Sequence, residues 1–194
     1  FSLLEWYRPD FNHHHLMDEV ESLLKTLLDC DSAQRFSYAQ IFQRYLNIDP
    51  HRATRENLKQ ILAHRKLSAE NLGLSNLNDY LNFLMAHVIE PQLPKQLIFI
   101  YDFPVSLAAL SKISSGNPAV LSDAREQRQR FTDDLNERAS RAYPSIPIDE
   151  YLLAALTHGL PNCAGVALGL DRLLMRVAKA NNLSEVISFP VQRA

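Results

Sequence analysis

The chain has 194 residues, of which 46% are hydrophobic and 22% are charged, and its formal net charge is -2 at pH 7. This composition is typical of a globular protein, and the length suffices for one domain with a sizeable core. The charge excludes an overall attraction to nucleic acid or anionic membranes, which leaves only a local basic patch for such a role. Cys30 and Cys163 form no CxxC motif, so we expect free thiols in a reducing cytoplasm. No apolar run in the sequence reaches the length of a membrane span.

The N-terminal part of the chain is predicted to form a strand followed by a helix. "FSLLEWY" alternates roughly and is rich in aromatic residues, which predicts a strand that Pro9 ends. Because this strand starts at the first residue, we expect the chain to begin inside a structural element. Asn12 is a good N-cap, and apolar side chains recur after it at helical spacing. These side chains are Leu16, Val20, Leu23, Leu24 and Leu27.

Further helices and one strand are predicted in the middle of the chain. Ser37 is a suitable cap for a short helix through Leu46. Two more helices are predicted over residues 54–64 and 75–88, and prolines end the second of them. "QLIFIYDF", residues 96–103, is a continuous apolar run of strand length, which predicts a buried strand.

The C-terminal half is predicted to mix helices and strands. Its expected elements are a loop at 113–120, a polar helix at 123–141 capped by Ser122, a helix at 149–158 opened by Asp149, a strand at 164–169, a helix at 170–180 and a strand at 185–189. Over the whole chain the elements show no regular β–α alternation. This order favours an α+β fold on an antiparallel sheet.

Glycines and an arginine gather where the strand at 164–169 meets the next helix. A strand that ends at Gly169 and feeds a helix leaves backbone N–H groups and the positive end of the helix dipole at the junction. Arg172 lies in the first helical turn, and phosphate oxygens suit both features. Gly165 and Gly169 would let a flat ring lie against the strand, whereas Asp171 is expected to cap a neighbouring N–H group. The alternative is a tight strand–helix turn with a surface arginine.

Glu5 and Tyr7 are two residues apart on the first predicted strand. Their side chains should therefore share one face, with Leu4 and Trp6 on the other. A carboxylate and a phenol side by side are good partners for an ammonium group. The alternative is an ordinary polar strand face.

Two other polar runs are expected to carry no site. Consecutive histidines at 13–15 fan out around a helix by about 100° each, so they do not converge on one metal ion. The basic run "AREQRQRF", residues 124–131, is mixed with acidic residues and is typical of a solvated helix face.

Four stretches together resemble one family, the class II aminoacyl-tRNA synthetases of the lysyl-type branch. "GVALGLDRLLM" resembles motif 3, and "FSLLEWYRP" resembles the second strand of motif 2. "LSDAREQRQRF" is similar to the stretch that follows the amino-acid pocket strand, and "DEYLLAALTHGLPNCAG" to the segment that leads into motif 3. The four stretches follow the family's order and extend over the whole chain. Together they are specific, although each alone is a weak signal.

The resemblance implies a fold and an activity. Residues 1–194 would be the C-terminal part of a class II synthetase-like catalytic domain, with the motif 2 strand at 1–9 and motif 3 at 164–177. The family activates an amino acid with ATP and Mg²⁺. By position, Glu5 and Tyr7 would contact the ammonium or amide groups of a lysine-like substrate. Gly169 would lie beneath the adenine, and Arg172 would hold the γ-phosphate as the catalytic residue.

Within the family, the chain is most similar to the lysyl-tRNA synthetase paralogues that attach β-lysine to a lysine of elongation factor P. Trp6, the stretch "PNCAGVALG" and the ending "FPVQRA" carry this similarity. Ala167 stands where lysyl-tRNA synthetases usually have glycine, and one methyl group in a tight pocket is worth about 1–3 kcal/mol of discrimination. Two alternatives stay open: a lysyl-tRNA synthetase that charges tRNA-Lys, and a non-catalytic binding module.

The sequence also departs from the family pattern. Motif 1 and the first half of motif 2, with an arginine for the α-phosphate, are expected before Phe1. A strand with a metal-binding glutamate is expected between Val120 and Leu121, and we expect its residues to be omitted rather than deleted. These 194 residues alone should then be inactive and hold no metal site. The resemblance implies a homodimer for the full-length protein.

Overall fold

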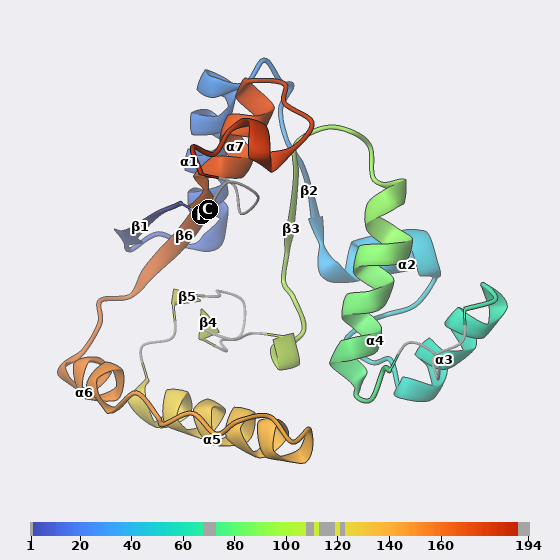
Figure 1. Cartoon of the computed structure of the whole chain (residues 1–194), viewed down its shortest axis with the longest axis vertical. Helices are drawn as coiled ribbons and strands as arrows, with labels where there is room; N and C mark the ends of the chain where they lie inside the picture. The colour runs from blue at the N-terminus through green and yellow to red at the C-terminus, as the bar shows by residue number, and fades with distance from the viewer. Residues whose placement is uncertain (1, 68–72, 108–110, 113–118, 121–122, 190–194) are drawn as a thin grey trace. The chain divides into compact units, whose positions relative to one another are not determined.

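A computed structural model describes residues 2–67, 73–107, 111–112, 119–120 and 123–189. The chain divides into two compact units. The first unit consists of Phe1–Cys30 and Ala109–Ala194, and the second unit is Asp31–Ala108. Figure 1 labels the elements of both. The assignment of the whole chain to one catalytic domain stays a prediction.

The first unit is built on an antiparallel pair of strands that lie far apart in the sequence. β1 spans Leu3–Pro9 and β6 spans Cys163–Gly169. They lie side by side in Figure 1, with Leu3 opposite Gly169 at one end and Pro9 opposite Cys163 at the other. Both strands, and the termination of the first at Pro9, are confirmed. The predicted antiparallel sheet is thereby confirmed in this unit.

α1, residues His13–Leu27, covers one side of this strand pair. Asn12 caps it, because the Asn12 side-chain oxygen accepts a hydrogen bond from the His15 backbone N–H at 2.9 Å. The predicted apolar spacing is confirmed, with Leu16, Val20 and Leu24 buried. Leu27 is instead 45% exposed.

α7, residues Leu170–Val177, starts directly at the end of β6 and contacts both strands. A short 3-10 helix, Leu183–Glu185, follows. The predicted strand at 185–189 is wrong, because Glu185 ends the 3-10 helix and residues 186–189 form a turn and bends. A strand needs a hydrogen-bonding neighbour, and no described strand pairs with this segment. Phe189 is accordingly 83% exposed.

Two helices complete the first unit. α5 spans Ala124–Ser140 and α6 spans Glu150–His158, and Arg128 of α5 binds both carboxylate oxygens of Glu150. Asp149 caps α6 as predicted. The cap of α5 is Asp123 rather than Ser122, since the Asp123 carboxylate accepts from two backbone N–H groups.

Two short strands fall near the predicted loop. β4, Ser111–Lys112, pairs antiparallel with β5, Ala119–Val120. The loop prediction for 113–120 is therefore wrong for its last two residues, and its remaining residues lie outside the described part of the chain. The predicted omission at the junction of Val120 and Leu121 also reaches beyond the described residues.

The second unit holds helices around a parallel strand pair. β2, Gln34–Ser37, pairs with β3, Ile98–Tyr101. The helices are α2 at Tyr38–Leu46, α3 at Arg55–His64 and α4 at Leu77–Leu84. α4 continues into a π-helical turn at Met85–Ile89 and a 3-10 turn at Glu90–Gln92, and a separate 3-10 turn at Val105–Leu107 follows β3. The three helices and β3 are confirmed. β2 was not predicted, β3 is half-buried rather than buried, and the pairing is parallel rather than antiparallel.

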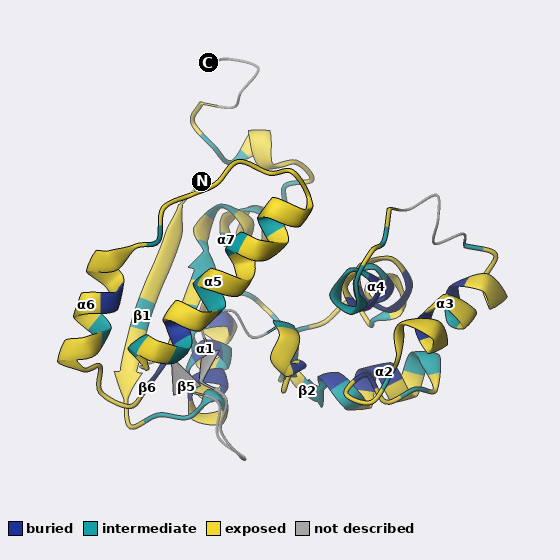
Figure 2. Cartoon of the chain, turned by 90° about the horizontal axis from the view of Figure 1, so that it is seen from below, coloured by how far each residue is buried: buried dark blue, intermediate teal, exposed yellow. Residues whose placement is uncertain are grey.

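A continuous hydrophobic core occupies the second unit. Tyr38, Ile41, Phe42, Leu58 and Leu62 are fully buried there. Figure 2 shows this burial as dark blue on α2 and α4, while β1 of the first unit is mostly yellow.

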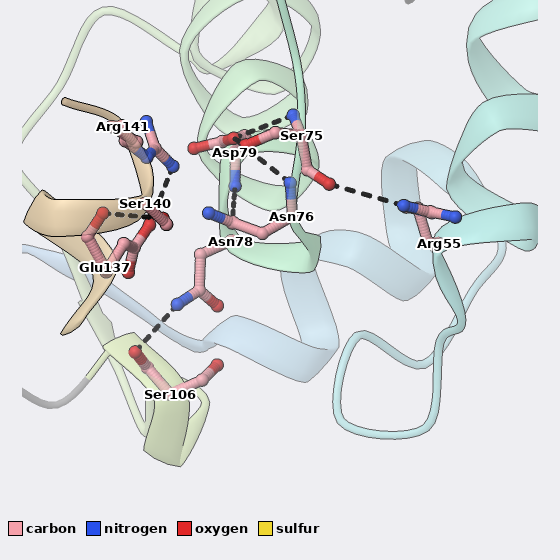
Figure 3. Close-up of polar contacts among 9 residues, drawn as sticks. All are labelled: Arg55, Ser75, Asn76, Asn78, Asp79, Ser106, Glu137, Ser140 and Arg141. Carbon is pink, nitrogen blue, oxygen red and sulfur yellow. Dashed lines mark hydrogen bonds and ion pairs between the residues drawn. The ribbon is translucent and has the colours of Figure 1, made fainter. Parts of the chain in front are cut away.

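Caps fix where these helices start. In α4, the Asn76 side chain accepts from the Asp79 N–H, while the Asp79 carboxylate accepts from the N–H groups of Asn76 and Ser75 (Figure 3). Arg55 of α3 donates to the Ser75 carbonyl at 3.4 Å. The reciprocal bonds between Asn76 and Asp79 satisfy backbone N–H groups that would otherwise be unpaired at the start of α4.

Candidate functional site

The register of β1 and β6 brings the predicted site residues to one face of the strand pair. Glu5 lies opposite Ala167, and Tyr7 lies opposite Gly165. Opposite residues of an antiparallel pair project to the same side. We call this side the motif face, defined by Leu3, Glu5, Tyr7, Gly165, Ala167 and Gly169. The prediction that Glu5 and Tyr7 share a face is confirmed.

The motif face is open to solvent. Tyr7 is 56% exposed, and Glu5 and Ala167 are exposed as well. Neither the Glu5 side chain nor the Tyr7 side chain makes a hydrogen bond or ion pair with another described residue. The opposite face is more covered, with Ala164 buried and Trp6 and Val166 half-buried. A carboxylate and a phenol are thus available together on the exposed side.

Gly165 is in contact with Tyr7 across the strand pair. A Cβ atom added to Gly165 would lie 2.5 Å from Tyr7 Cε1 and 2.6 Å from Tyr7 Cδ1. Carbon atoms that are not bonded sit about 3.5–4.0 Å apart. The ring of Tyr7 therefore lies against the backbone of Gly165, and the prediction that the flat ring of a ligand lies there stays a prediction.

Gly169 differs from Gly165, because space is free beside it. Among the described residues, an added Cβ would meet only Arg172 Cδ, at 3.9 Å, which is ordinary van der Waals contact. The stem of Arg172 thus runs beside the bare backbone at the end of the motif face. Arg172 is exposed, and its guanidinium makes no ion pair within the described part of the chain. A free guanidinium and a helix start together suit an anionic ligand.

Asp171 has a structural contact, as predicted. Its Oδ2 accepts a hydrogen bond from the Ser2 backbone N–H at 2.8 Å. The Leu170 N–H donates to the Ser2 carbonyl at 3.0 Å. These two bonds join the start of β1 to the start of α7, and so hold Arg172 close to the motif face.

Arg8 and Glu19 form an ion pair that the sequence analysis did not identify. Arg8 Nε donates to the two Glu19 carboxylate oxygens at 2.9 and 3.0 Å, and Nη2 makes a further bond to Oε1. The hydrogen bonds from Arg8, and secondarily its charge, hold the pKa of Glu19 below its usual value. This pair ties β1 to α1 on the side away from the motif face.

The triple histidine lies at the start of α1. The rings of His13 and His14 are 4.0 Å apart between centroids, while the His15 backbone donates to the cap residue Asn12. Across the residues that the structure describes, no three His, Cys, Asp or Glu side chains are grouped to hold a metal ion.

The sequence of the chain is similar to known proteins of one family. Residues 115–193 match the family model described as tRNA synthetases class II (D, K and N). The whole chain is 42% identical to an elongation factor P–(R)-β-lysine ligase from Edwardsiella ictaluri. Residues 115–193 are thus similar to a domain of the class II aminoacyl-tRNA synthetase family, and the whole chain is similar to this ligase. Its α+β elements with a small antiparallel sheet agree with that family.

Other relatives of the chain are also named elongation factor P–(R)-β-lysine ligase. Ligases from Hamiltonella defensa and Proteus mirabilis are also 42% identical over 100% of this chain. The chain spans 66% of the length of each of these relatives, just under two thirds. The stretch matched to each is 214 residues long, against 194 here, so each relative carries at least 20 residues that have no counterpart. That these residues follow Val120, as the predicted omission requires, stays a prediction.

Two further features of the chain concern its thiols and its helices. Both cysteines are free thiols, Cys163 buried and Cys30 partly so. In the parts of the chain that the structure describes, no helix is both long enough and apolar enough to cross a lipid bilayer.

Proposed function

We propose that the protein activates lysine or β-lysine with ATP as an aminoacyl-adenylate and transfers the acyl group to a lysine of elongation factor P. The observation that carries this proposal is the register of β1 and β6, which puts Glu5, Tyr7, Ala167 and Gly169 on one open face. The chain is 42% identical over its whole length to a protein named elongation factor P–(R)-β-lysine ligase, which supports the choice of substrate and acceptor.

The amino-acid end of the site lies at Glu5 and Tyr7. The Glu5 carboxylate neutralises an ammonium group of the substrate, and the Tyr7 hydroxyl accepts or donates a hydrogen bond beside it. Ala167, opposite Glu5, adds one methyl group to the floor between them. That methyl group favours an amino acid of different shape from the one a glycine would admit.

The nucleotide end of the site lies at Gly169 and Arg172. The adenine lies over the bare backbone of Gly169, and the Arg172 guanidinium binds the γ-phosphate. The open space beside Gly169 and the free guanidinium fit this role.

The reaction has two steps. In the first, the amino-acid carboxylate attacks the α-phosphorus of ATP, the bond to the β-phosphate oxygen breaks, and pyrophosphate leaves. In the second, the neutral amine of the acceptor lysine attacks the acyl carbon, AMP leaves, and the amine loses its proton. No covalent bond to the protein forms, so the side chains act by positioning and by neutralising charge.

Three further assignments belong to the full-length protein. Mg²⁺ would neutralise phosphate charge when bound, and no step is assigned to it because the described residues hold no group of three or more His, Cys, Asp or Glu side chains that could bind a metal ion. We also propose that the full-length protein is a homodimer and works in the cytoplasm, where the two free thiols stay reduced.

An exchange assay tests this function. The full-length protein is incubated with ATP, labelled pyrophosphate and either lysine or β-lysine, and label entering ATP is measured. We expect exchange that depends on the amino acid, followed by acylation of elongation factor P. Acylation of tRNA-Lys instead would support a lysyl-tRNA synthetase. Absence of exchange with both amino acids would support the third hypothesis, a non-catalytic binding module.

A further inference from the structure

We infer that Gly165 is a positioning residue, which seats the ring of Tyr7 against β6 and thereby sets the amino-acid end of the site. The substrate named in this inference rests on the proposed function. The contact itself rests on the geometry of β1 and β6. Tyr7 and Gly165 are register partners, and such partners bring their Cβ atoms within about 4.5–5.5 Å.

The contact leaves no room for a side chain at position 165. Added there, a Cβ would lie 2.5 Å from Tyr7 Cε1, 2.6 Å from Cδ1 and 3.4 Å from Cζ. The Cδ1–Cε1 edge of the ring therefore fills the volume that the side chain of any other residue would need.

Gly165 is required for this space and not for its backbone conformation. Among the described glycines, only Gly73 and Gly159 have a positive φ. Alanine at 165 would adopt the strand conformation without strain. Its only conflict is with the Tyr7 ring, which would have to leave its position.

The expected consequence is confined to one end of the motif face. Glu5 is the neighbour of Tyr7 on this face, whereas Gly169 lies four residues beyond Gly165 on β6. A displaced ring changes the geometry at the ammonium group and leaves the nucleotide end intact. The Michaelis constant for the amino acid should rise, while that for ATP should not.

A double-mutant cycle tests the inference in the full-length protein. Gly165→Ala is made in the wild type, in Tyr7→Phe and in Tyr7→Ala, and pyrophosphate exchange is measured against β-lysine and against ATP. Phenylalanine keeps the ring carbons that meet position 165, and alanine removes them. We expect Gly165→Ala to raise the KM for β-lysine about tenfold or more in the wild type and in Tyr7→Phe. In Tyr7→Ala it should change that KM less than about twofold.

Two kinetic results would overturn the inference. One is an equal penalty of Gly165→Ala in the Tyr7→Ala background, because the effect would then not act through the ring. The other is a matching rise in the KM for ATP.

Thermal unfolding of the same proteins separates this inference from the proposed function. Absence of amino-acid-dependent exchange in the wild type would remove the proposed function and the substrate part of the inference. The contact between the Tyr7 ring and Gly165 would still be tested. Gly165→Ala should lower Tm when residue 7 is tyrosine or phenylalanine, and should not lower it when residue 7 is alanine. If Gly165→Ala alone does not fold, the double variant with Tyr7→Ala decides. A folded double variant supports the contact between the Tyr7 ring and Gly165, and an unfolded one overturns it.

Discussion

The two units of the chain differ in how completely they bury their apolar side chains. The second unit has a core of fully buried residues, including Tyr38, Phe42 and Leu81. In the first unit the most buried apolar side chains of α1, such as Leu16 and Leu24, keep 7–9% exposure. Large exposed side chains are concentrated there too, Tyr151 at 91% and Phe189 at 83% among them.

This difference suggests that the second unit contributes mainly to stability and that the first unit contributes the functional surface. The second unit closes around its own core, which is how packed side chains stabilise a fold. The first unit carries all the residues of the motif face, and that face stays open. An exposed surface that combines apolar and unpaired polar groups is typical of a surface that binds a ligand or another chain. We therefore expect core substitutions to act on stability in the second unit and motif-face substitutions to act on activity.

The largest effect should follow from opening a cavity in the second unit. Phe42 is fully buried, and Phe42→Ala should lower the free energy of unfolding by about 3–5 kcal/mol. Leu27 is 45% exposed in the last turn of α1, and Leu27→Ala should lower the free energy of unfolding by less than about 0.5 kcal/mol. Chemical denaturation of both variants measures the difference. Similar losses in the two variants would contradict the contrast between the units.

Activity should depend on Arg172 with little change in stability. Arg172→Ala should lower pyrophosphate exchange about a hundredfold or more, because a preorganised charge on the phosphates is lost. Arg176→Ala removes an exposed arginine one turn later on α7 and serves as the matched control. Both variants should unfold at the wild-type temperature. Equal loss of exchange in the two would show that α7 contributes only general positive charge.

The smallest effect should come from the ion pair between β1 and α1. Because Arg8 lowers the pKa of Glu19 in the folded state, the pair stabilises the protein above the unfolded pKa of glutamate, about 4.3. This contribution is lost as the pH falls through the lower folded value. Unfolding measured from pH 7 to pH 3 should show a shallower acid-side decline in Glu19→Gln than in the wild type. Parallel curves would mean that the pair makes no pH-dependent contribution.

Local signals in the sequence predicted most of the elements. Asn12, Ser37 and Thr54 each precede a helix and cap it, because capping depends on a few neighbouring residues. Long-range pairing was harder to predict. β2 has only four residues and pairs with a strand more than sixty residues later. The segment 185–189 has strand-like composition but no described partner.

The same limit applies to the site. Glu5, Tyr7, Ala167, Gly169 and Arg172 could be singled out from spacing and from resemblance to a family. The contact of Tyr7 with Gly165 could not, since it depends on the register of two strands separated by more than 150 residues. No single stretch of sequence encodes that register.

We expect the motif face to hold one ligand, with its amino-acid end at Glu5 and Tyr7 and its nucleotide end at Gly169 and Arg172. This arrangement can be tested by a crystal structure of the full-length protein with a non-hydrolysable lysyl- or β-lysyl-adenylate analogue. The ammonium group should lie within hydrogen-bonding distance of Glu5 and the adenine over Gly169, with Arg172 beside the phosphate-binding region. An analogue bound away from this face, or with Glu5 and Arg172 on surfaces that the ligand does not connect, would contradict it.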